Sequence, residues 1–359
     1  MTEYDISKIL DEMELEIVEA LKGHLSEGLK GTTSEWQKRQ LVELRRFRKE
    51  NKKIIDKYMV AVNEGSRTML KEAYKKSFAT RVKDISKRAR HGSRIEAKIN
   101  NITTLDNLIS IDDARIVAIM DAVTNDIDNK MYSLYRRDED VYRQTIFKAT
   151  TLVNTGQYDL VSAINLAQAD YLAKGITDCL YKNGVQMPIR SYAEMALRTN
   201  AMRAASQARG LVCDYLGINT VMISRHQSSC PACGVWEGRI VIDDVYCTVS
   251  DEEAKSSIYP RLSQVIASGY KHPNCRHTET EIDPEIDDDY KPKTYTKSDK
   301  KRYEAEQKQR EIEREIRKLK RQNAGTVKMS DELKAKNEQL IKHLEDNPLL
   351  KRKKWREEP

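Results

Sequence analysis

SSCPACGVWEGRIV, residues 228–241, places two cysteines in a short knuckle, separated by two residues. Downstream, HPNCRH at 272–277 places a histidine and a cysteine at the same spacing. Donors spaced in this way can both face one ion, and thiolate sulfur and imidazole nitrogen are typical donors of tetrahedral zinc sites. Because four protein ligands leave no open position, the pattern predicts a structural zinc site. Its predicted ligands are Cys230, Cys233, His272 and Cys275.

The two ligand pairs are separated by 38 residues, which is long for a zinc finger. His226, Cys247 and His277 are therefore possible substitutes as ligands. Alternatively, the cysteines are small core residues and HPNCRH is an ordinary turn. The N-terminal residues lack a signal-peptide pattern, so we expect reduced thiols, which favours metal ligation over disulfides. Cys179 and Cys213 lie in helical-looking stretches, and we expect both to be buried.

The composition favours helices and argues against a membrane protein. The chain has 359 residues, enough for two or three domains, and 33% of them are charged. Gly, Pro and Phe are scarce, which favours helix over sheet. No run of eighteen apolar residues occurs, so we expect no membrane-spanning segment.

The net charge of +7 conceals an uneven distribution along the chain. Residues 36–98 hold 20 Lys and Arg against 7 Asp and Glu, and residues 291–359 hold 22 against 13. The segment between them, 99–290, is acidic, with 18 against 27. Basic stretches of this size suit a polyanion or an acidic protein surface, although a charge run is often only a solvated helix face.

Cations in the two basic segments are the candidate contact residues. Aromatic residues are sparse among them, which argues against a stacking platform for single strands and favours sequence-independent contact with phosphates. The candidates are Arg45, Arg46, Arg48, Lys49, Lys52, Lys53, Lys75, Lys76, Arg88, Arg314, Arg317 and Lys318.

Hydrophobic periodicity predicts helices through the first half of the chain. An amphipathic helix is expected at 3–24, a long helix after the capping box of Thr32 and Glu35, and a third basic helix at about 66–90.

In the middle of the chain, two helices are expected at 111–135 and 139–153. A further helix is expected to begin at the capping box of Ser191 and Glu194 and to end before Gly217.

After this helix, the spacing of the hydrophobic residues changes from that of a helix to that of a strand. Residues 219–224 and 239–242 predict a hairpin with the CPAC knuckle at its tip. Charged helices are expected at 298–322 and 331–346, followed by a mobile basic tail from residue 351.

The predicted fold class is mainly α, with long charged helices and a small β-hairpin-containing zinc-binding module, α+β overall. The predicted domains are an N-terminal basic helical region at 1–100, an acidic helical domain at 101–218, the zinc-knuckle module at 219–290 and a C-terminal basic helical tail at 291–359.

His272, Asn274 and His277 also spell H-x-N-x-x-H, which suggests a nuclease of the HNH type. Such an enzyme needs a histidine base beside a hydrolytic metal with open coordination. No spare carboxylate–histidine pair lies nearby in the sequence, and the zinc site uses His272. A zinc-containing HNH-like nuclease acting on DNA is therefore kept only as the alternative to a non-enzymatic protein.

Three stretches resemble the minor capsid protein 2 family of tailed phages, which is related to the Mu F-like head morphogenesis proteins. They are SYAEMALRTNAMRAA at 191–205, the two cysteine-containing stretches quoted above, and YEAEQKQREIEREIRKLKRQ at 303–322. Together they cover roughly 190–322 in the order expected for the family.

The resemblance implies a non-enzymatic virion component inside the head near the portal, present in the host cytoplasm during assembly. The implied partners are the phage portal protein, packaged double-stranded DNA and other head proteins, such as the major capsid protein or a scaffold. It also implies a part in head assembly and in DNA packaging or delivery. Some Mu F-like proteins carry toxin domains, but this chain ends in a basic helix, so no toxin activity is inferred.

Overall fold

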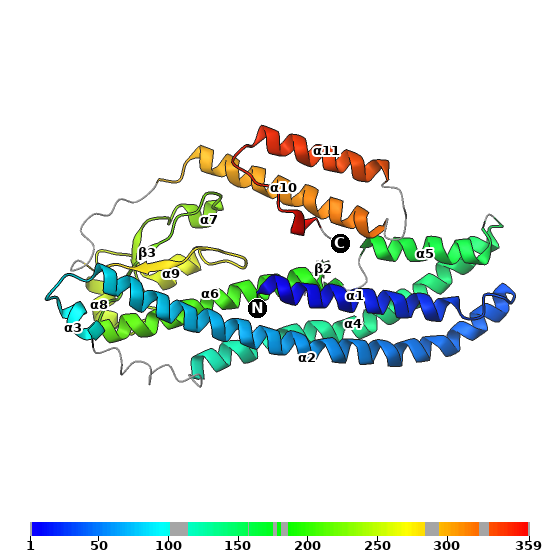
Figure 1. Ribbon diagram of the computed structural model, residues 1–359, viewed down its shortest axis with the longest axis horizontal. Coiled ribbons are helices and arrows are strands. Elements are labelled where there is room, and N and C mark those ends of the chain that lie inside the picture. Colours follow the sequence, from blue (N-terminus) through cyan, green and yellow to red (C-terminus); the bar gives the residue numbers. More distant parts are fainter. Residues whose placement is uncertain are drawn as a thin grey trace. The chain divides into compact units, whose positions relative to one another are not determined.

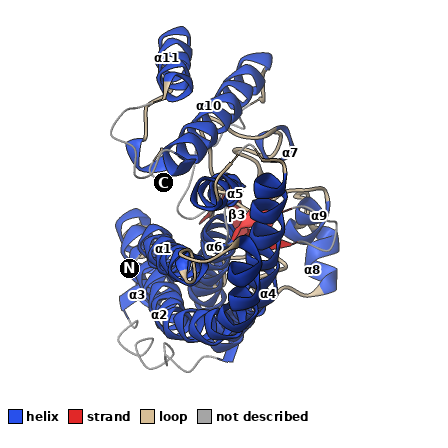
Figure 2. Ribbon diagram, turned by 90° about the vertical axis from the view of Figure 1, so that its right-hand side faces the viewer, coloured by secondary structure: helices blue, strands red, loops and turns tan. Residues whose placement is uncertain are grey.

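The computed structural model describes residues 2–100, 114–156, 158–174, 178–180, 186–283, 294–322 and 330–357. Over these residues the protein is mainly helical, with two small β-sheets (Figures 1 and 2). The helices are α1 (Glu3–Ser26), α2 (Thr33–Arg88), α3 (Arg94–Asn100), α4 (Ala114–Asn154), α5 (Leu160–Lys174), α6 (Ile189–Leu216), α7 (Pro231–Gly234), α8 (Asp251–Ser256), α9 (Leu262–Ala267), α10 (Lys297–Gln322), α11 (Asp331–Asp346) and the 3₁₀-helix η2 (Lys354–Arg356). The strands are β1 (Asp178–Leu180), β2 (Gln186–Pro188), β3 (Thr220–Ile223), β4 (Ile240–Ile242) and β5 (Glu279–Glu281).

The chain divides into two compact units, each assembled from separate stretches of sequence. Unit 1 comprises Met1–Glu3, Gly65–Asn125 and Met195–Glu304. Unit 2 comprises Tyr4–Glu64, Asp126–Glu194 and Ala305–Pro359. Helices α2, α4, α6 and α10 contribute residues to both units, and α1 contributes its first residue, Glu3, to unit 1. The division into four segments along the sequence stays a prediction.

Two predicted helix breaks are wrong. The basic helical stretches expected on either side of Gly65 form the single 56-residue helix α2, because buried residues such as Val62 and Leu70 continue its apolar stripe. The expected pair of helices at 111–135 and 139–153 is one helix, α4, whose buried face continues across the expected break through Asp138. Residues 111–113 lie outside the described residues.

Capping explains most helix boundaries. The Thr32 backbone N–H donates to Glu35 (2.7 Å), and the Glu35 N–H donates to the Thr32 hydroxyl (3.3 Å), so this capping box is confirmed. Helix α6 begins at Ile189, so the expected box of Ser191 and Glu194 does not cap it; Arg190 donates to Glu194 instead (3.3 Å). At the other end, Gly217 (φ 75°) donates to the Cys213 carbonyl (2.8 Å), which confirms the predicted stop.

Strands β3 and β4 form the predicted antiparallel hairpin. A third strand, β5, pairs antiparallel with the other edge of β3, giving the order β4-β3-β5, and the sequence did not indicate it. The two-stranded sheet of β1 and β2 was also not predicted. Residues 219–283, which contain β3, β4, β5 and helices α7–α9, are called the hairpin module below; all lie in unit 1.

The two C-terminal helices pack along a narrow apolar seam. Ile312 and Ile316 of α10 are buried against Leu333 and Leu340 of α11. The tail that follows was expected to be mobile, but Arg356 is buried and its carbonyl accepts hydrogen bonds from the Arg317 guanidinium, the shorter at 2.7 Å. None of the described helices is long and apolar enough to cross a membrane.

A buried polar pair lies inside unit 2. Asp138 and Asn51 are both buried, and the Asn51 amide nitrogen donates to Asp138 Oδ2 (2.8 Å). The second oxygen of each side chain, Asp138 Oδ1 and Asn51 Oδ1, has no hydrogen-bond partner. One proton on Asp138 would give both orphan oxygens a partner. Burial in fact raises the pKa of Asp138 to about 7, although Asn51 and Arg137 oppose the shift.

This carboxyl makes stability depend on pH. Below about pH 4 both the folded and the unfolded chain hold the proton; between about 4 and 7 only the folded chain does, so stability falls as the pH rises. The free energy of unfolding should fall by up to roughly 4 kcal/mol between about pH 4 and pH 7 in the wild type. We expect Asp138→Asn to abolish this fall, because an amide pairs reciprocally with Asn51 at any pH. Urea unfolding from pH 4.5 to 7.5 measures it. The exposed Asp140→Asn is the control, and an unchanged slope in Asp138→Asn contradicts the assignment.

Candidate metal centre and basic surfaces

The tip of the β3–β4 hairpin presents the first pair of cysteines. Cys230 caps the N-terminus of α7 in an extended conformation, and its sulfur accepts the Cys233 N–H (3.4 Å). Pro231 at the first helical position fixes the turn, because its ring sets φ and its missing N–H is not needed there. Tyr295 donates from its hydroxyl to the Ser229 carbonyl (3.1 Å) and covers Gly234, where a side chain would collide with its ring.

The loop between α9 and β5 presents the second pair. The Cys275 N–H donates to the His272 carbonyl (2.9 Å), which closes a tight turn around Pro273 and Asn274. Lys271 (φ 55°) and Asn274 (φ 68°) both adopt the left-handed conformation that non-glycine residues rarely take. Asn274 is held in it by the Arg198 guanidinium, which donates to its side-chain oxygen (2.7 Å). The loop therefore carries local strain that its contacts offset.

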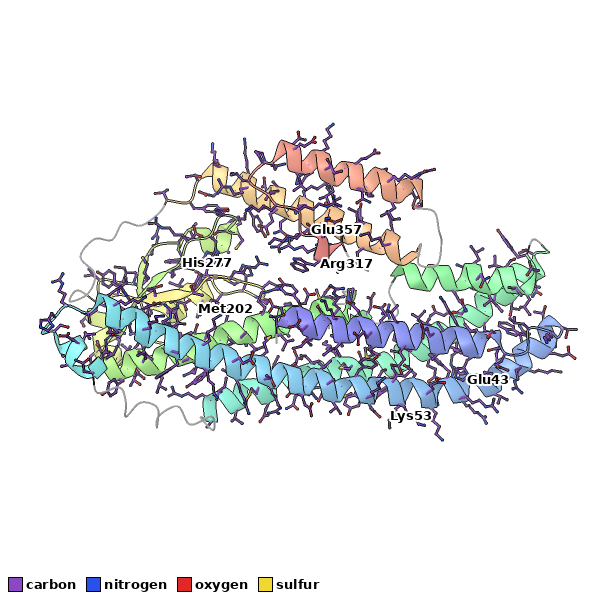
Figure 3. All side chains as sticks on the ribbon, in the orientation of Figure 1. Glu43, Lys53, Met202, His277, Arg317 and Glu357 are labelled. Atoms are coloured by element: carbon purple, nitrogen blue, oxygen red, sulfur yellow. The ribbon has the colours of Figure 1, made fainter. Side chains whose placement is uncertain are left out.

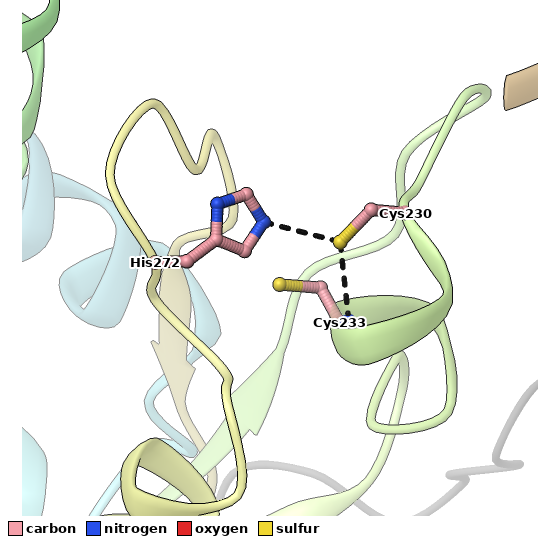
Figure 4. A group of neighbouring side chains, drawn as sticks. All are labelled: Cys230, Cys233 and His272. Carbon is pink, nitrogen blue, oxygen red and sulfur yellow. Dashed lines mark hydrogen bonds between the residues drawn. The ribbon is translucent and has the colours of Figure 1, made fainter. Parts of the chain in front are cut away.

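Folding brings the four predicted ligands into two groups of close donors that share Cys233, and a fifth donor joins them. Cys230, Cys233 and His272 form one group of mutually close donor atoms, all within 4.8 Å (Figure 4). Cys233, Cys275 and His277 form a second such group, so Cys233 belongs to both. His277 was considered only as a substitute ligand in the sequence. The sequence alone does not place His277 in this group, because His272 and Cys275 already form a complete ligand pair within HPNCRH.

The distances between donors fit a tetrahedral ion. Zinc–ligand bonds of about 2.3 Å to sulfur and 2.0–2.1 Å to nitrogen place two sulfurs about 3.7 Å apart, and sulfur and nitrogen about 3.6 Å apart. The sulfurs of Cys233 and Cys275 are 3.7 Å apart, and Cys275 Sγ lies 3.4 Å from His277 Nδ1. Cys230 Sγ lies 3.1 Å from His272 Nε2, somewhat closer than such an edge. Two of these separations match edges of a tetrahedral zinc site, although no four donors of the described residues lie within 4.8 Å of one another.

In each histidine, the ring nitrogen that does not face a cysteine sulfur lies within hydrogen-bond distance of an oxygen acceptor. His277 Nε2 is 3.0 Å from the Glu237 carboxylate, and His272 Nδ1 is 2.8 Å from the Pro273 carbonyl. Both acceptors require an N–H, so in each neutral ring the lone pair belongs to the nitrogen that faces a cysteine sulfur. Metal-ligating histidines typically have this arrangement.

The buried charges around the cluster shift its pKa values. Hydrogen bonds with Cys233 and His277 lower the pKa of the Cys275 thiol to about 4, while burial opposes the shift. Hydrogen bonding to Cys275 and burial raise the pKa of Cys233. Burial alone would raise the pKa of Glu237, but hydrogen bonds from Ser229 and from the His226 backbone, together with His277, lower it overall. Within this coupled pair, the hydrogen bonds favour the negative charge on Cys275 over Cys233.

The other substitute ligands belong to neither donor group. Cys247 is hydrogen-bonded to Cys213 and belongs to neither donor group. His226 uses Nε2 to contact the Arg276 carbonyl (2.8 Å), and its ring packs edge-on against His277. Cys179 and Cys213 are buried as expected, although Cys179 lies in strand β1 and not in a helix.

A buried ionic network holds the HPNCRH loop against the sheet. The Arg209 side chain, fully buried on α6, donates to Asp243 and lies 3.8 Å from Glu279 of β5. Glu279 also accepts hydrogen bonds from Lys271 (2.9 Å) and from the Tyr270 hydroxyl (2.7 Å). Because Lys271 precedes His272, this network sets the position of the second ligand pair. A small cavity of about 170 Å³ beside it is lined in part by His272, Cys275 and His277.

The twelve candidate contact cations differ in whether they already pair with other residues of this chain. Arg88 donates to the Glu281 carboxylate of β5 (3.1 Å), and Arg317 is bonded to the C-terminal segment, so both contribute to the fold. Arg46 pairs with the buried Glu43 (2.9 Å), and Arg48 pairs with Glu139. The remaining eight are exposed, and the described residues give them no ion-pair partner: Arg45, Lys49, Lys52, Lys53, Lys75, Lys76, Arg314 and Lys318.

An open hollow lies on unit 2 beside the first half of α2, where Figure 3 labels Lys53. Its volume is about 490 Å³, and four cations and two carboxylates line it. Lys57 is bonded to Glu16 (2.8 Å) and His24 to Glu50 (2.8 Å), so both carboxylates have internal partners. The hollow therefore presents an excess of positive charge.

The nuclease alternative meets a geometric obstacle. Folding does create a carboxylate–histidine pair that the sequence did not indicate, Glu237 with His277. A general base needs a ring nitrogen directed at substrate, but both nitrogens of His277 are occupied, by Glu237 and Cys275. Both nitrogens of His272 are occupied as well.

Replacing Arg209 tests the buried network. We expect Arg209→Met to lower the free energy of unfolding by about 3–5 kcal/mol, because Asp243 and Glu279 lose their buried counter-charge while the volume is nearly kept. Urea unfolding measures the change. Arg203→Met, an exposed position on the same helix, should cost less than about 0.5 kcal/mol. Equal losses in the two variants contradict a central role for Arg209.

Comparison with known proteins gives one match. Residues 2–346 match the family described as phage minor capsid protein 2. The match includes the N-terminal helices, which carry no recognisable motif of their own. No curated protein and no solved structure matches the chain.

Proposed function

Because the chain belongs to the phage minor capsid protein 2 family, a family of structural phage head components, we propose that it lies inside the head near the portal and contacts packaged double-stranded DNA. In this role it aids head assembly and the packaging or delivery of the genome. Its partners are the portal protein, DNA and other head proteins, and no catalysis is part of this role.

One observation carries the DNA contact: the exposed cations in the first half of α2. Arg45, Lys49 and Lys53 follow one another at intervals of four residues, so they form a ridge along one side of the helix. Lys49 and Lys53 also line the hollow, whose carboxylates are already paired. An unpaired row of cations gains most from a polyanion, because each phosphate contact releases counterions. An acidic surface of the portal is the other partner that this ridge would fit.

We propose that the hairpin module is stapled by one zinc ion, held by the three thiolates of Cys230, Cys233 and Cys275 and one histidine. The donor distances and the two outer hydrogen bonds of the histidines support this. Four protein ligands close the coordination shell, so the zinc would stabilise the module and take no part in a reaction. The zinc-dependent nuclease stays the alternative function, and the occupied nitrogens of both histidines argue against it.

Neutralising the ridge tests the DNA contact. We expect the triple variant Arg45→Gln, Lys49→Gln, Lys53→Gln to bind duplex DNA at least tenfold more weakly at about 100 mM salt. The slope of log affinity against log salt should fall by about 3, because three phosphate contacts are lost. Arg46 is left unchanged, since its partner Glu43 is buried. Fluorescence anisotropy across a salt series measures both quantities.

The matched control neutralises three exposed lysines outside the ridge, Lys300, Lys301 and Lys342. If the two triple variants bind DNA alike, the ridge is not the DNA contact. Co-purification with the portal protein provides the second arm. Loss of portal binding with unchanged DNA binding in the ridge variant assigns the ridge to the portal. Cleavage of the DNA by wild-type protein in Mg²⁺ or Mn²⁺ would favour the nuclease.

The zinc staple predicts a defined metal content. We expect about one zinc per purified chain, lost in Cys233→Ala because that thiol belongs to both donor groups. Cys247→Ala is the control, since this buried thiol of the same unit contacts Cys213 instead. Elemental analysis after dialysis gives the answer, and a wild-type chain without zinc contradicts the staple.

A further inference from the structure

The five donors around Cys233 outnumber the four positions of one tetrahedral ion, so one donor is left over. Cys233 belongs to both groups of close donors, Cys230 lies in the group of His272, and Cys275 lies in the group of His277. With three thiolates as ligands, the choice is between His272 and His277. The sequence favours His272, because it completes the symmetrical pattern of ligand pairs. The geometry and burial of the two histidines favour the other choice.

We propose that His277 is the histidine ligand of the metal, with Cys230, Cys233 and Cys275, and that Glu237 is its positioning residue. His272 is then a dispensable neighbour at the solvent side of the cluster. This inference rests on the proposed zinc staple and specifies its ligands.

Burial separates the two histidines. His277 is 4% exposed, and its partners Cys233 and Cys275 are buried with it, whereas His272 is only partly buried. A structural ion is held most firmly where water does not compete for its ligands. The His277 group also has the donor distances closest to tetrahedral edges, at 3.7 and 3.4 Å.

The two histidines also differ in the hydrogen-bond acceptor of the ring nitrogen that does not face a cysteine. His277 donates to a carboxylate that is 1% exposed, whereas His272 donates to a backbone carbonyl in an exposed contact. Glu237 is itself fixed by the Ser229 hydroxyl and by the His226 backbone N–H (2.6 Å). A buried, fixed carboxylate orients the ring and strengthens its donor nitrogen, as in carboxylate–histidine–zinc triads.

The buried carboxylate is specific to His277. Glu237 lies against its Nε2, and no comparable buried carboxylate lies against His272 in the contacts of the described residues.

Single substitutions of the full-length protein separate the two histidines. We expect His277→Ala to weaken zinc binding at least 100-fold in a chelator competition, and His272→Ala to change it less than about threefold. Glu237→Gln should weaken binding about 10- to 100-fold, because it loses the charge that orients His277. The double variant Glu237→Gln, His277→Ala should bind no more weakly than His277→Ala alone, which shows that Glu237 acts through the ring.

A second substitution keeps the test decisive if His277→Ala fails to fold. We expect His277→Cys to retain the metal and, with Co²⁺ in place of zinc, to increase the sulfur charge-transfer absorption by about one third, from three thiolates to four. His272→Cys should leave that spectrum unchanged. The opposite pattern in either experiment overturns the inference, as does a content of two ions per chain. A wild-type chain without zinc refutes the staple itself, whereas zinc that depends on His272 refutes only the choice of ligand.

Discussion

Burial of charge is the constraint on which the hairpin module depends. Arg209 lies out of contact with solvent, and its counter-charges, Asp243 and Glu279, come from the segment after β4 and from β5. Ions removed from water stabilise a fold only when partners in good geometry surround them. Helix α6, the hairpin and the third strand are therefore held in one mutual arrangement. A small apolar core, including Val221 and Val241, completes the module.

Features set by local sequence were predictable. The knuckle at the hairpin tip follows from the spacing of Cys230 and Cys233, and the end of α6 from the position of Gly217. Strand β5 escaped detection because its sequence, ETE, is polar where buried strands are usually apolar. Arg209, Lys271 and Arg88 neutralise its buried glutamates, and two of these partners, Arg209 and Arg88, are distant in sequence.

The candidate site was predictable in kind but incomplete. The pairing of Glu237 with His277 joins residues 40 positions apart, so only folding reveals it. The predicted zinc site and contact surfaces stay predictions, but the structure reduces the number of cations that are available to contact a partner. Composition identified twelve of them, yet Arg88 and Arg317 serve the fold itself. Charge along a sequence thus identifies a basic helix, whereas only tertiary contacts distinguish the side chains that remain available to a partner.

The strand order β4-β3-β5 has a consequence for folding during synthesis. Strand β3 can pair with β4 as soon as the hairpin has left the ribosome, but its other edge waits for Glu279–Glu281, more than thirty residues after the end of β4. Contacts between such distant segments form late. During that interval β3 presents an open edge, and open edges can pair with strands of other chains. A nascent chain halted before β5 is therefore the form of this protein most exposed to misassembly.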